Sequence, residues 1–100
     1  MNMDIGQAMQ ALKEGRYVTR KGWNGRGMFL WWKPPATVRS EWCHDPVLKH
    51  LCDVRGGTVD ATGTVCMYTA QGTVVSGWLA SQTDLAADDF EVVDPFPDGE

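Results

Sequence analysis

The stretch Gly77-Trp78-Leu79-Ala80-Ser81-Gln82-Thr83-Asp84-Leu85-Ala86-Ala87-Asp88-Asp89-Phe90 decides how the fold is arranged. Ser81 and Asp84 have the spacing of a capping box, in which two side chains satisfy the free N–H groups that begin a helix. This spacing predicts a helix over residues 81–88. The same N–H groups, at the positive end of the helix dipole, are able to bind an anion instead. Because caps are common and binding sites are rare, the spacing alone favours a strand end, a capped helix and a core tryptophan.

The composition indicates one globular domain. The 100 residues are 43% hydrophobic and 22% charged, and no apolar run approaches the roughly 18 residues of a membrane span. The start of the chain lacks the basic and apolar segments of a signal peptide, so we expect an intracellular protein. Three cysteines, Cys43, Cys52 and Cys66, then favour free thiols. We expect a single domain over residues 1–93 and a frayed acidic tail over residues 94–100.

Charge is distributed unevenly along the chain. The net charge of −4 argues against general binding of DNA or RNA, which needs a basic face. One short region nevertheless holds a single acid, Glu14, and six basic residues: Lys13, Arg16, Arg20, Lys21, Arg26 and Lys33. From Asp84 to the end of the sequence there are seven acids and no basic residue. This pattern favours a small anionic ligand over a nucleic acid.

Periodicity and turn residues predict an α+β fold, in which an N-terminal helix packs on a small antiparallel sheet. Asp4 and Gln7 form a second possible capping box, and Gly15 is placed to end the helix over residues 4–14. Strands are predicted over residues 17–20, 28–33, 63–69, 73–75 and 90–93, with the first four in two hairpins. The short second helix, over residues 81–88, precedes the last strand. Between Pro34-Pro35 and residue 63, the sequence predicts a short helix capped by Asp45 and a minor strand over residues 58–61.

Metal binding and catalysis find little support in the sequence. The ligand types Cys43, His44, His50 and Cys52 lack a familiar zinc spacing, so we expect no metal. Ser81, Asp84 and a distant histidine make a conceivable triad, but no nucleophile elbow frames the serine. The acids of residues 84–89 are explained by a solvated helix face. We therefore expect a protein that is not an enzyme.

The chain is unusually rich in tryptophan, with five in 100 residues. Trp31 and Trp32 are predicted to fill the core or a subunit interface. Trp23 lies in a polar turn with three glycines, where burial is harder. An exposed indole there suits a planar anionic ligand, because bases stack on aromatic rings with about 1–3 kcal/mol each and cations bind phosphate. The neighbouring polar candidates are Arg20, Lys21, Asn24 and Arg26.

Four blocks of sequence carry a resemblance to a known family. They are Arg20-Lys21-Gly22-Trp23-Asn24-Gly25, Gly27-Met28-Phe29-Leu30, Cys66-Met67-Tyr68-Thr69-Ala70-Gln71-Gly72 and Trp78-Leu79-Ala80-Ser81-Gln82-Thr83-Asp84-Leu85. In this order, over about residues 3 to 93, they resemble the second Thoeris anti-defence family of small phage and prophage proteins. Phe90 departs from the pattern, since members often have tryptophan there, and residues 37–63 match nothing firmly.

The resemblance implies a non-catalytic sponge that sequesters cyclic nucleotide immune signals, such as glycocyclic ADP-ribose or cyclic dinucleotides, in the bacterial host cytoplasm. It implies homotetramers with pockets at subunit interfaces, and no cofactor. Carried over to this sequence, Trp23 and Trp78 are the aromatic walls of the pocket. The polar contacts to the ligand are Asn24, Ser81, Thr83 and Asp84, to which the charge pattern adds Arg20, Lys21 and Arg26. Two alternatives stay open: a nucleotide-hydrolysing enzyme, and a structural or partner-binding phage protein with Trp31 and Trp32 as an interface stripe.

Overall fold

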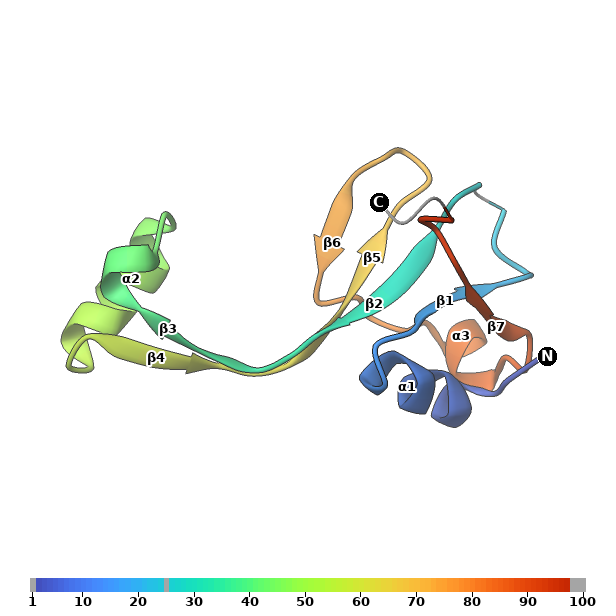
Figure 1. The fold of residues 1–100 in the computed structure, drawn as a ribbon, viewed down its shortest axis with the longest axis horizontal. Coiled ribbons are helices and arrows are strands. Elements are labelled where there is room, and N and C mark those ends of the chain that lie inside the picture. The colour runs from blue at the N-terminus through green and yellow to red at the C-terminus, as the bar shows by residue number, and fades with distance from the viewer. Residues whose placement is uncertain (1, 25, 98–100) are drawn as a thin grey trace. The chain divides into compact units, whose positions relative to one another are not determined.

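A computed structural model describes residues 2–24 and 26–97 of the chain, which form two compact units. The first, here called the sheet unit, comprises Met1–Lys33 and Thr64–Glu100. The second, the hairpin unit, comprises Pro34–Gly63 and lies within the range predicted as a single domain. The described residues confirm the predicted α+β class, with antiparallel strands and an N-terminal helix on the larger sheet (Figure 1).

The sheet unit is built on five antiparallel strands in the order β6-β5-β2-β1-β7. The register places Leu30 opposite both Val18 and Met67, and Arg20 opposite Phe90. Both predicted hairpins are confirmed, β1 with β2 and β5 with β6, and the final strand joins the sheet beside β1. The bounds are β1 (Tyr17–Arg20), β2 (Phe29–Lys33), β5 (Thr64–Tyr68), β6 (Val74–Ser76) and β7 (Phe90–Val93).

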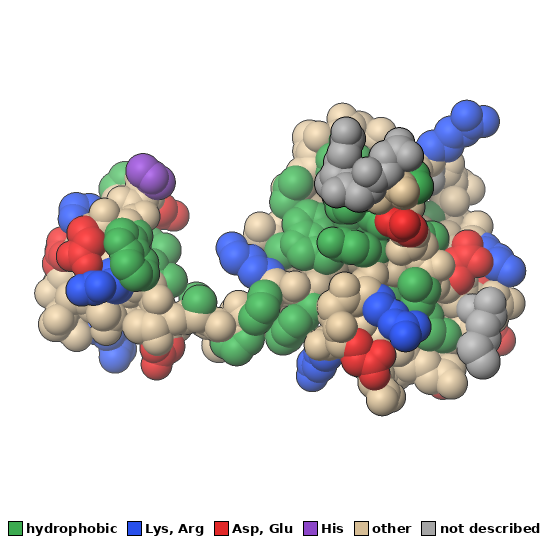
Figure 2. Space-filling model, in the orientation of Figure 1, with side chains coloured by type: hydrophobic (Ala, Val, Ile, Leu, Met, Phe, Trp, Pro, Cys, Tyr) green, Lys and Arg blue, Asp and Glu red, His purple; other side chains and the backbone are tan. Residues whose placement is uncertain are grey.

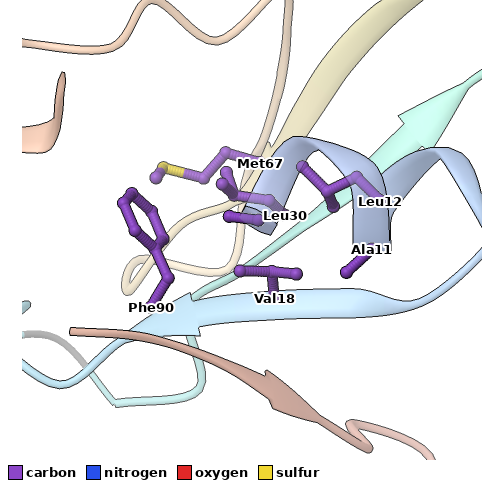
Figure 3. Close-up of a cluster of buried hydrophobic side chains, with 7 residues drawn as sticks. Ala11, Leu12, Val18, Leu30, Met67 and Phe90 are labelled. Carbon is purple, nitrogen blue, oxygen red and sulfur yellow. The ribbon is translucent and has the colours of Figure 1, made fainter. Parts of the chain in front are cut away.

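Helix α1 (Ile5–Lys13) begins as its sequence predicts. The Asp4 carboxylate accepts a hydrogen bond from the Gln7 N–H at 2.8 Å, and the Gln7 side chain accepts one from the Asp4 N–H at 3.0 Å. The helix buries Ala8, Ala11 and Leu12 against the sheet. Figure 3 shows side chains from α1 and four strands pointing toward one another in this core: Ala11, Leu12, Val18, Leu30, Met67 and Phe90.

Gly15 ends α1 in the left-handed conformation, with φ at +91°. An alanine there meets no atom within 4 Å, so its cost is backbone strain alone. We expect Gly15→Ala to lower the free energy of unfolding by about 1 kcal/mol. The matched control is Gly6→Ala, inside the same helix, which we expect to raise it by about 0.5–1 kcal/mol. Urea titration of both variants measures the difference, and equal midpoints would contradict this account of the helix end.

The two faces of the sheet bury different side chains. Helix α1 and the short α3 (Gln82–Ala86) cover one face, onto which Trp32 also packs, beneath the Lys13 ammonium. The opposite face is aromatic, with a shallow cavity of about 320 Å³ lined by Tyr17, Phe29, Trp31, Tyr68 and Phe96. Trp31 and Trp32 therefore do not form the shared interface stripe considered above, because successive strand residues point to opposite faces. Figure 2 shows hydrophobic side chains gathered over β5 and β6.

The tail, which was expected to fray, makes a contact in its first part. The ring of Phe96 meets Tyr17 and Phe29 edge-on, at centroid distances of 5.7 and 5.9 Å. Edge-to-face rings attract each other, so Phe96 covers part of the aromatic face. The rest of the predicted tail, residues 98–100, lies outside the described residues.

The hairpin unit pairs β3 (Ala36–Arg39) with β4 (Thr58–Ala61), in the register Val38 to Val59. Between them lie a single 3-10 turn, η1 (Ser40–Trp42), and helix α2 (Pro46–Val54). The predicted cap is confirmed, since the Asp45 carboxylate accepts from the N–H groups of Val47 and Leu48. The predicted minor strand is β4, whereas β3 was missed. None of the helices in the described part of the chain is long and apolar enough to cross a membrane.

Candidate functional site

The Asp84 carboxylate is the centre of the stretch of residues 77–90. It is only 7% exposed and accepts four hydrogen bonds. One oxygen accepts from Arg20 Nη1 at 2.6 Å and from Trp23 Nε1 at 3.2 Å. The other accepts from the backbone N–H and the hydroxyl of Ser81, at 3.0 and 2.9 Å. The predicted capping box thus exists, and its acid is also the link between α3, strand β1 and the turn that follows it.

Arg20 is held between two carboxylates. Its Nη1 meets Asp84, and its Nε donates to Asp89 at 2.7 Å. Asp89 also accepts from the Gly22 N–H at 2.8 Å, and the guanidinium carbon lies 5.7 Å from the centroid of the Phe90 ring. The Arg20 side chain is 11% exposed, so this pairing takes place largely out of water. Such charge-assisted bonds fix the end of β1 against the start of β7.

The ionisation of these groups follows from the contacts. Burial raises the pKa of Asp84, but the hydrogen bonds from Ser81, Arg20 and Trp23 outweigh it, so that the pKa lies below the ordinary carboxyl value. The hydrogen bond from Arg20 is the main cause that lowers the pKa of Asp89. The same bonds raise the pKa of Arg20. All three groups are charged at neutral pH.

These shifts predict an acid-sensitive fold. A carboxyl with a lowered pKa in the folded state stabilises that state above its unfolded pKa of about 3.9. This stabilisation begins to be lost when the pH falls below the pKa of the unfolded chain, and it is gone once the pH has fallen through the lower pKa of the folded state. We expect the thermal midpoint to fall more steeply below pH 4 in the natural chain than in Asp84→Asn, whose side chain does not titrate. Parallel pH profiles of the two proteins would contradict the assignment.

The two tryptophans of the predicted aromatic walls are neighbours. The rings of Trp23 and Trp78 lie 6.1 Å apart between centroids, at 71° to each other, and both are partly exposed. Trp23 also meets the buried Phe90 ring edge-on at 6.5 Å. Trp23 is therefore half-buried, whereas its glycine-rich turn predicts an exposed indole, because its ring packs edge-on against Phe90 and its N–H reaches Asp84.

The other predicted site residues divide into two groups. Ser81 joins the tryptophans through Asp84, and its hydroxyl also accepts from the Asp84 N–H at 3.1 Å. The cap thus satisfies N–H groups that were considered for an anion. Thr83, on α3, is exposed, and so are three residues of the turn after β1: Lys21, Asn24 and Arg26. The Lys21 ammonium lies 3.9 Å from the Glu91 carboxylate.

The structure changes the picture of the charged residues in two places. Residues 84–89 do not form a solvated helix face, because α3 ends at Ala86 and Asp84 is buried. Part of the basic region of residues 13–33 is neutralised within the fold. Pairing of β1 with β7 brings Arg20 and Lys21 onto the acidic end of the chain. Among the described residues, no group of three or more His, Cys, Asp or Glu side chains is placed to hold a metal ion.

Comparison with known proteins assigns this arrangement to a family. The model of the Tad2-like, or Thoeris anti-defense 2-like, domain matches residues 3–93. The chain belongs to this family. It is also similar to Thoeris anti-defense 2 of Bacillus phage SP01, with 30% identity over a 98-residue alignment; the match covers 91% of this chain and 94% of that protein. Membership confirms the resemblance inferred from the four blocks, and it supports a role in phage anti-defence.

The hydrogen bonds around Asp84 and Arg20 form one network, here called the Asp84 network: Arg20, Gly22, Trp23, Ser81, Asp84 and Asp89. The Tad2-like match covers all of these residues, including one that the sequence analysis did not single out. Asp89 appeared only as one acid among several, although it holds both Arg20 and the Gly22 N–H. The sequence did contain one signal for this pairing, the contrast between the basic N-terminal region and the acidic C-terminal region. That contrast predicts that the two regions attract each other, but it does not tell which acid pairs with Arg20. Arg20 and Asp89 are 69 positions apart, too far for a local spacing rule.

Proposed function

We propose that this chain binds a cyclic nucleotide immune signal and sequesters it without cleaving it. The signal is glycocyclic ADP-ribose or a cyclic dinucleotide, both of which combine planar bases with ribose and phosphate. Such signals act inside the bacterial cell, so the proposed location is the host cytoplasm. Membership of the anti-defence family supports the biological role. The observation that supports the ligand class is the pair of partly exposed tryptophans, Trp23 and Trp78, held 6.1 Å apart.

The tryptophan pair is held in place before any ligand arrives. Trp23 is fixed on one edge by its hydrogen bond to Asp84 and on another by the Phe90 ring. A ring that is already ordered loses little conformational entropy when a base stacks on it. Stacking contributes about 1–3 kcal/mol per base, and nanomolar sequestration needs about 12 kcal/mol in total. Polar contacts must therefore supply much of the remainder.

The polar residues take separate roles in this proposal. Asn24 and Arg26 on the turn, and Thr83 on α3, are exposed and available to phosphate, ribose or base edges. Lys21 is exposed too, but it has to leave the Glu91 carboxylate at 3.9 Å before it can bind a phosphate. Arg20 and Asp84 satisfy each other and are positioning residues, because their charges are already paired. Ser81 caps α3 and is itself exposed, like Thr83. The site thus has a rigid inner layer and an adaptable outer layer of polar groups.

The same contacts favour binding over hydrolysis. A general acid at neutral pH needs a raised carboxyl pKa, whereas the pKa values of Asp84 and Asp89 are lowered by their hydrogen bonds. The Ser81 hydroxyl bonds to Asp84, not to a histidine that would activate it as a nucleophile. The hydrolysing enzyme therefore remains the alternative with less support.

Titration with a panel of cyclic nucleotides, followed by heat release and chromatography of the ligand, tests this function. We expect tight binding and recovery of intact ligand. Recovery of an altered product would replace the sponge by an enzyme. Absence of binding to every member of the panel, together with capture of a host protein, would favour the partner-binding alternative.

We also propose that the chain assembles as a homo-oligomer, a tetramer in keeping with the resemblance. Strand β6 supports this assembly, because it lies at an edge of the sheet. It pairs with β5 on one side, and no other strand in the described part of the chain pairs with its other side. Its side chains are exposed, including Val74 at 58%, and residues 72–78 carry no charge. Edge strands without charge or proline pair readily with another strand.

A charge on this edge tests the assembly. We expect Val74→Lys to reduce the mass measured by light scattering, because lysine on an edge strand opposes pairing. The exposure of Val74 means that the protomer itself should stay folded. Val92→Lys on β7, at the other edge and also exposed, is the matched control. An unchanged mass for Val74→Lys with a reduced mass for Val92→Lys would move the interface to β7.

A further inference from the structure

The hairpin unit holds two thiols in contact. Cys43 follows η1 and is half-buried, while Cys52 on α2 is fully buried. Their sulfur atoms are 3.9 Å apart. The Cys43 thiol also lies 3.4 Å from the Arg39 carbonyl oxygen, and the Cys52 thiol 3.6 Å from that of Val38. Neither thiol takes part in the function proposed above.

Local contacts hold η1 and α2 in the position that brings the thiols together. The Asp45 carboxylate fixes the start of α2. The Ser40 hydroxyl donates to the Asp53 carboxylate on α2 and accepts from the Lys49 ammonium at 3.1 Å. Cys43, which directly follows η1, is therefore tied to the helix that carries Cys52. The proximity of the two sulfurs follows from these bonds as well as from the nine positions that separate the residues.

A disulfide bond is about 2.05 Å long, so the two sulfurs must approach by roughly 2 Å to form one. Cys43 is extended and lies outside any helix or strand, so a small shift of this residue breaks no strand pairing or helix hydrogen bond. We propose that Cys43 and Cys52 are a modification site, at which small-molecule disulfides of the glutathione type form a reversible intrachain disulfide. This clip would join η1 to α2 and open again in excess thiol.

The reaction proceeds by two thiol–disulfide exchanges. Cys43, the accessible thiol, loses its proton to solvent and attacks one sulfur of the small disulfide, which releases one small thiol and leaves a mixed disulfide. Cys52 then loses its proton and attacks the Cys43 sulfur, which releases the second small thiol. Burial raises the pKa of Cys52, so it reacts second. In sum, two protein thiols are oxidised and one small disulfide is reduced.

The clip would matter because the hairpin unit has little else to hold it. The unit consists only of residues 34–63. Folds of fewer than roughly 40 residues usually need disulfides, metals or partners to be stable. Among the described residues of this unit, Cys52 is the one hydrophobic side chain that is fully buried. Several large apolar side chains are exposed instead, including Trp42, Val47 and Val54. A cross-link would restrict the opening of this unit.

The test uses the full chain, reduced and then incubated with oxidised glutathione. We expect mass spectrometry after alkylation to show loss of two of the three reactive thiols, and peptide mapping to join Cys43 to Cys52. Amide hydrogens of α2 should exchange about tenfold more slowly in the oxidised form. Excess reduced thiol should restore all three thiols and the original exchange rate.

Two variants separate the clip from general oxidation. Cys66→Ala removes the buried thiol of β5 and should leave the cross-link unchanged. Cys43→Ser keeps a small polar group at a half-buried position and should abolish both the cross-link and the slower exchange. A stable mixed disulfide at Cys43, a disulfide between two chains, or three thiols that persist at high oxidised glutathione would each overturn the proposal.

Discussion

Replacing Asp84 with alanine should lower the free energy of unfolding by about 3 kcal/mol and the thermal midpoint by more than about 10 °C. This single substitution removes the carboxylate that accepts hydrogen bonds from the Arg20 guanidinium, the Trp23 ring N–H and the Ser81 backbone N–H. It leaves a largely buried guanidinium with one carboxylate, Asp89, in place of two. Because Asp89 retains part of the pairing, the expected cost lies at the lower end for a broken buried ion pair.

The neighbouring Asp88 gives a matched control for this experiment. It is exposed and lies beyond the end of α3, so Asp88→Ala should change the stability by less than about 0.5 kcal/mol. Asp84→Asn should fall between the two, because an amide keeps the shape of the side chain and loses its charge. Calorimetry of the three variants measures the series. If Asp84→Ala and Asp88→Ala melted together, the Asp84 network would not stabilise the fold.

Replacing Trp23 with alanine should weaken binding of the cyclic nucleotide by about 5- to 150-fold, the range that corresponds to one lost stacking contact. The ring also packs against Phe90, so some stability should be lost with it. Trp23→Phe keeps an aromatic ring in this place but removes the second ring of the indole, together with the N–H that bonds to Asp84. We expect this variant to recover most of the affinity, which isothermal titration calorimetry with glycocyclic ADP-ribose and cyclic dinucleotides can measure.

Trp42 provides the control for the tryptophan substitutions. It is 62% exposed in the hairpin unit, where the Arg39 guanidinium lies over its ring. Trp42→Ala removes the same side chain from a position outside the proposed site and should leave the affinity unchanged. A folded Trp23→Ala protein that binds the signal as the natural chain does would show that the tryptophan pair is not the pocket.

Local rules predicted most of the fold because most of its elements carry their own signals. Helix α1 has a cap, an apolar stripe and a terminal glycine, and α2 and α3 each begin at a capping acid or serine. Strand β3 lacked such a signal. Pro34-Pro35 indicates the end of a strand, and the partner of β3 lies beyond a helix, so only the folded chain reveals their pairing.

The site was harder to predict than the fold, because its geometry depends on distant partners. Spacing identified Ser81 and Asp84 as a cap, but the burial of Asp84 depends on Arg20, 64 positions away. Trp23 was placed at the surface by the composition of its turn. Its position depends instead on Phe90, which belongs to a strand near the other end of the sequence. Periodicity describes neighbours along the chain and carries no information about such contacts.

The pairing of β1 with β7 also sets the order in which a growing chain can fold. As the chain is made, β1 and β2 emerge early, but the partner of β1 on its other side emerges only after Asp89, 69 positions after Arg20. Until then the Arg20 guanidinium lacks both of its carboxylates and the core lacks Phe90. Contacts between such distant residues slow folding and leave edges exposed in the meantime. Ribosomes stalled before residue 84 should therefore carry a nascent chain that is sensitive to protease. Once a chain that extends beyond residue 93 is released from the ribosome, the sheet unit should fold in one step.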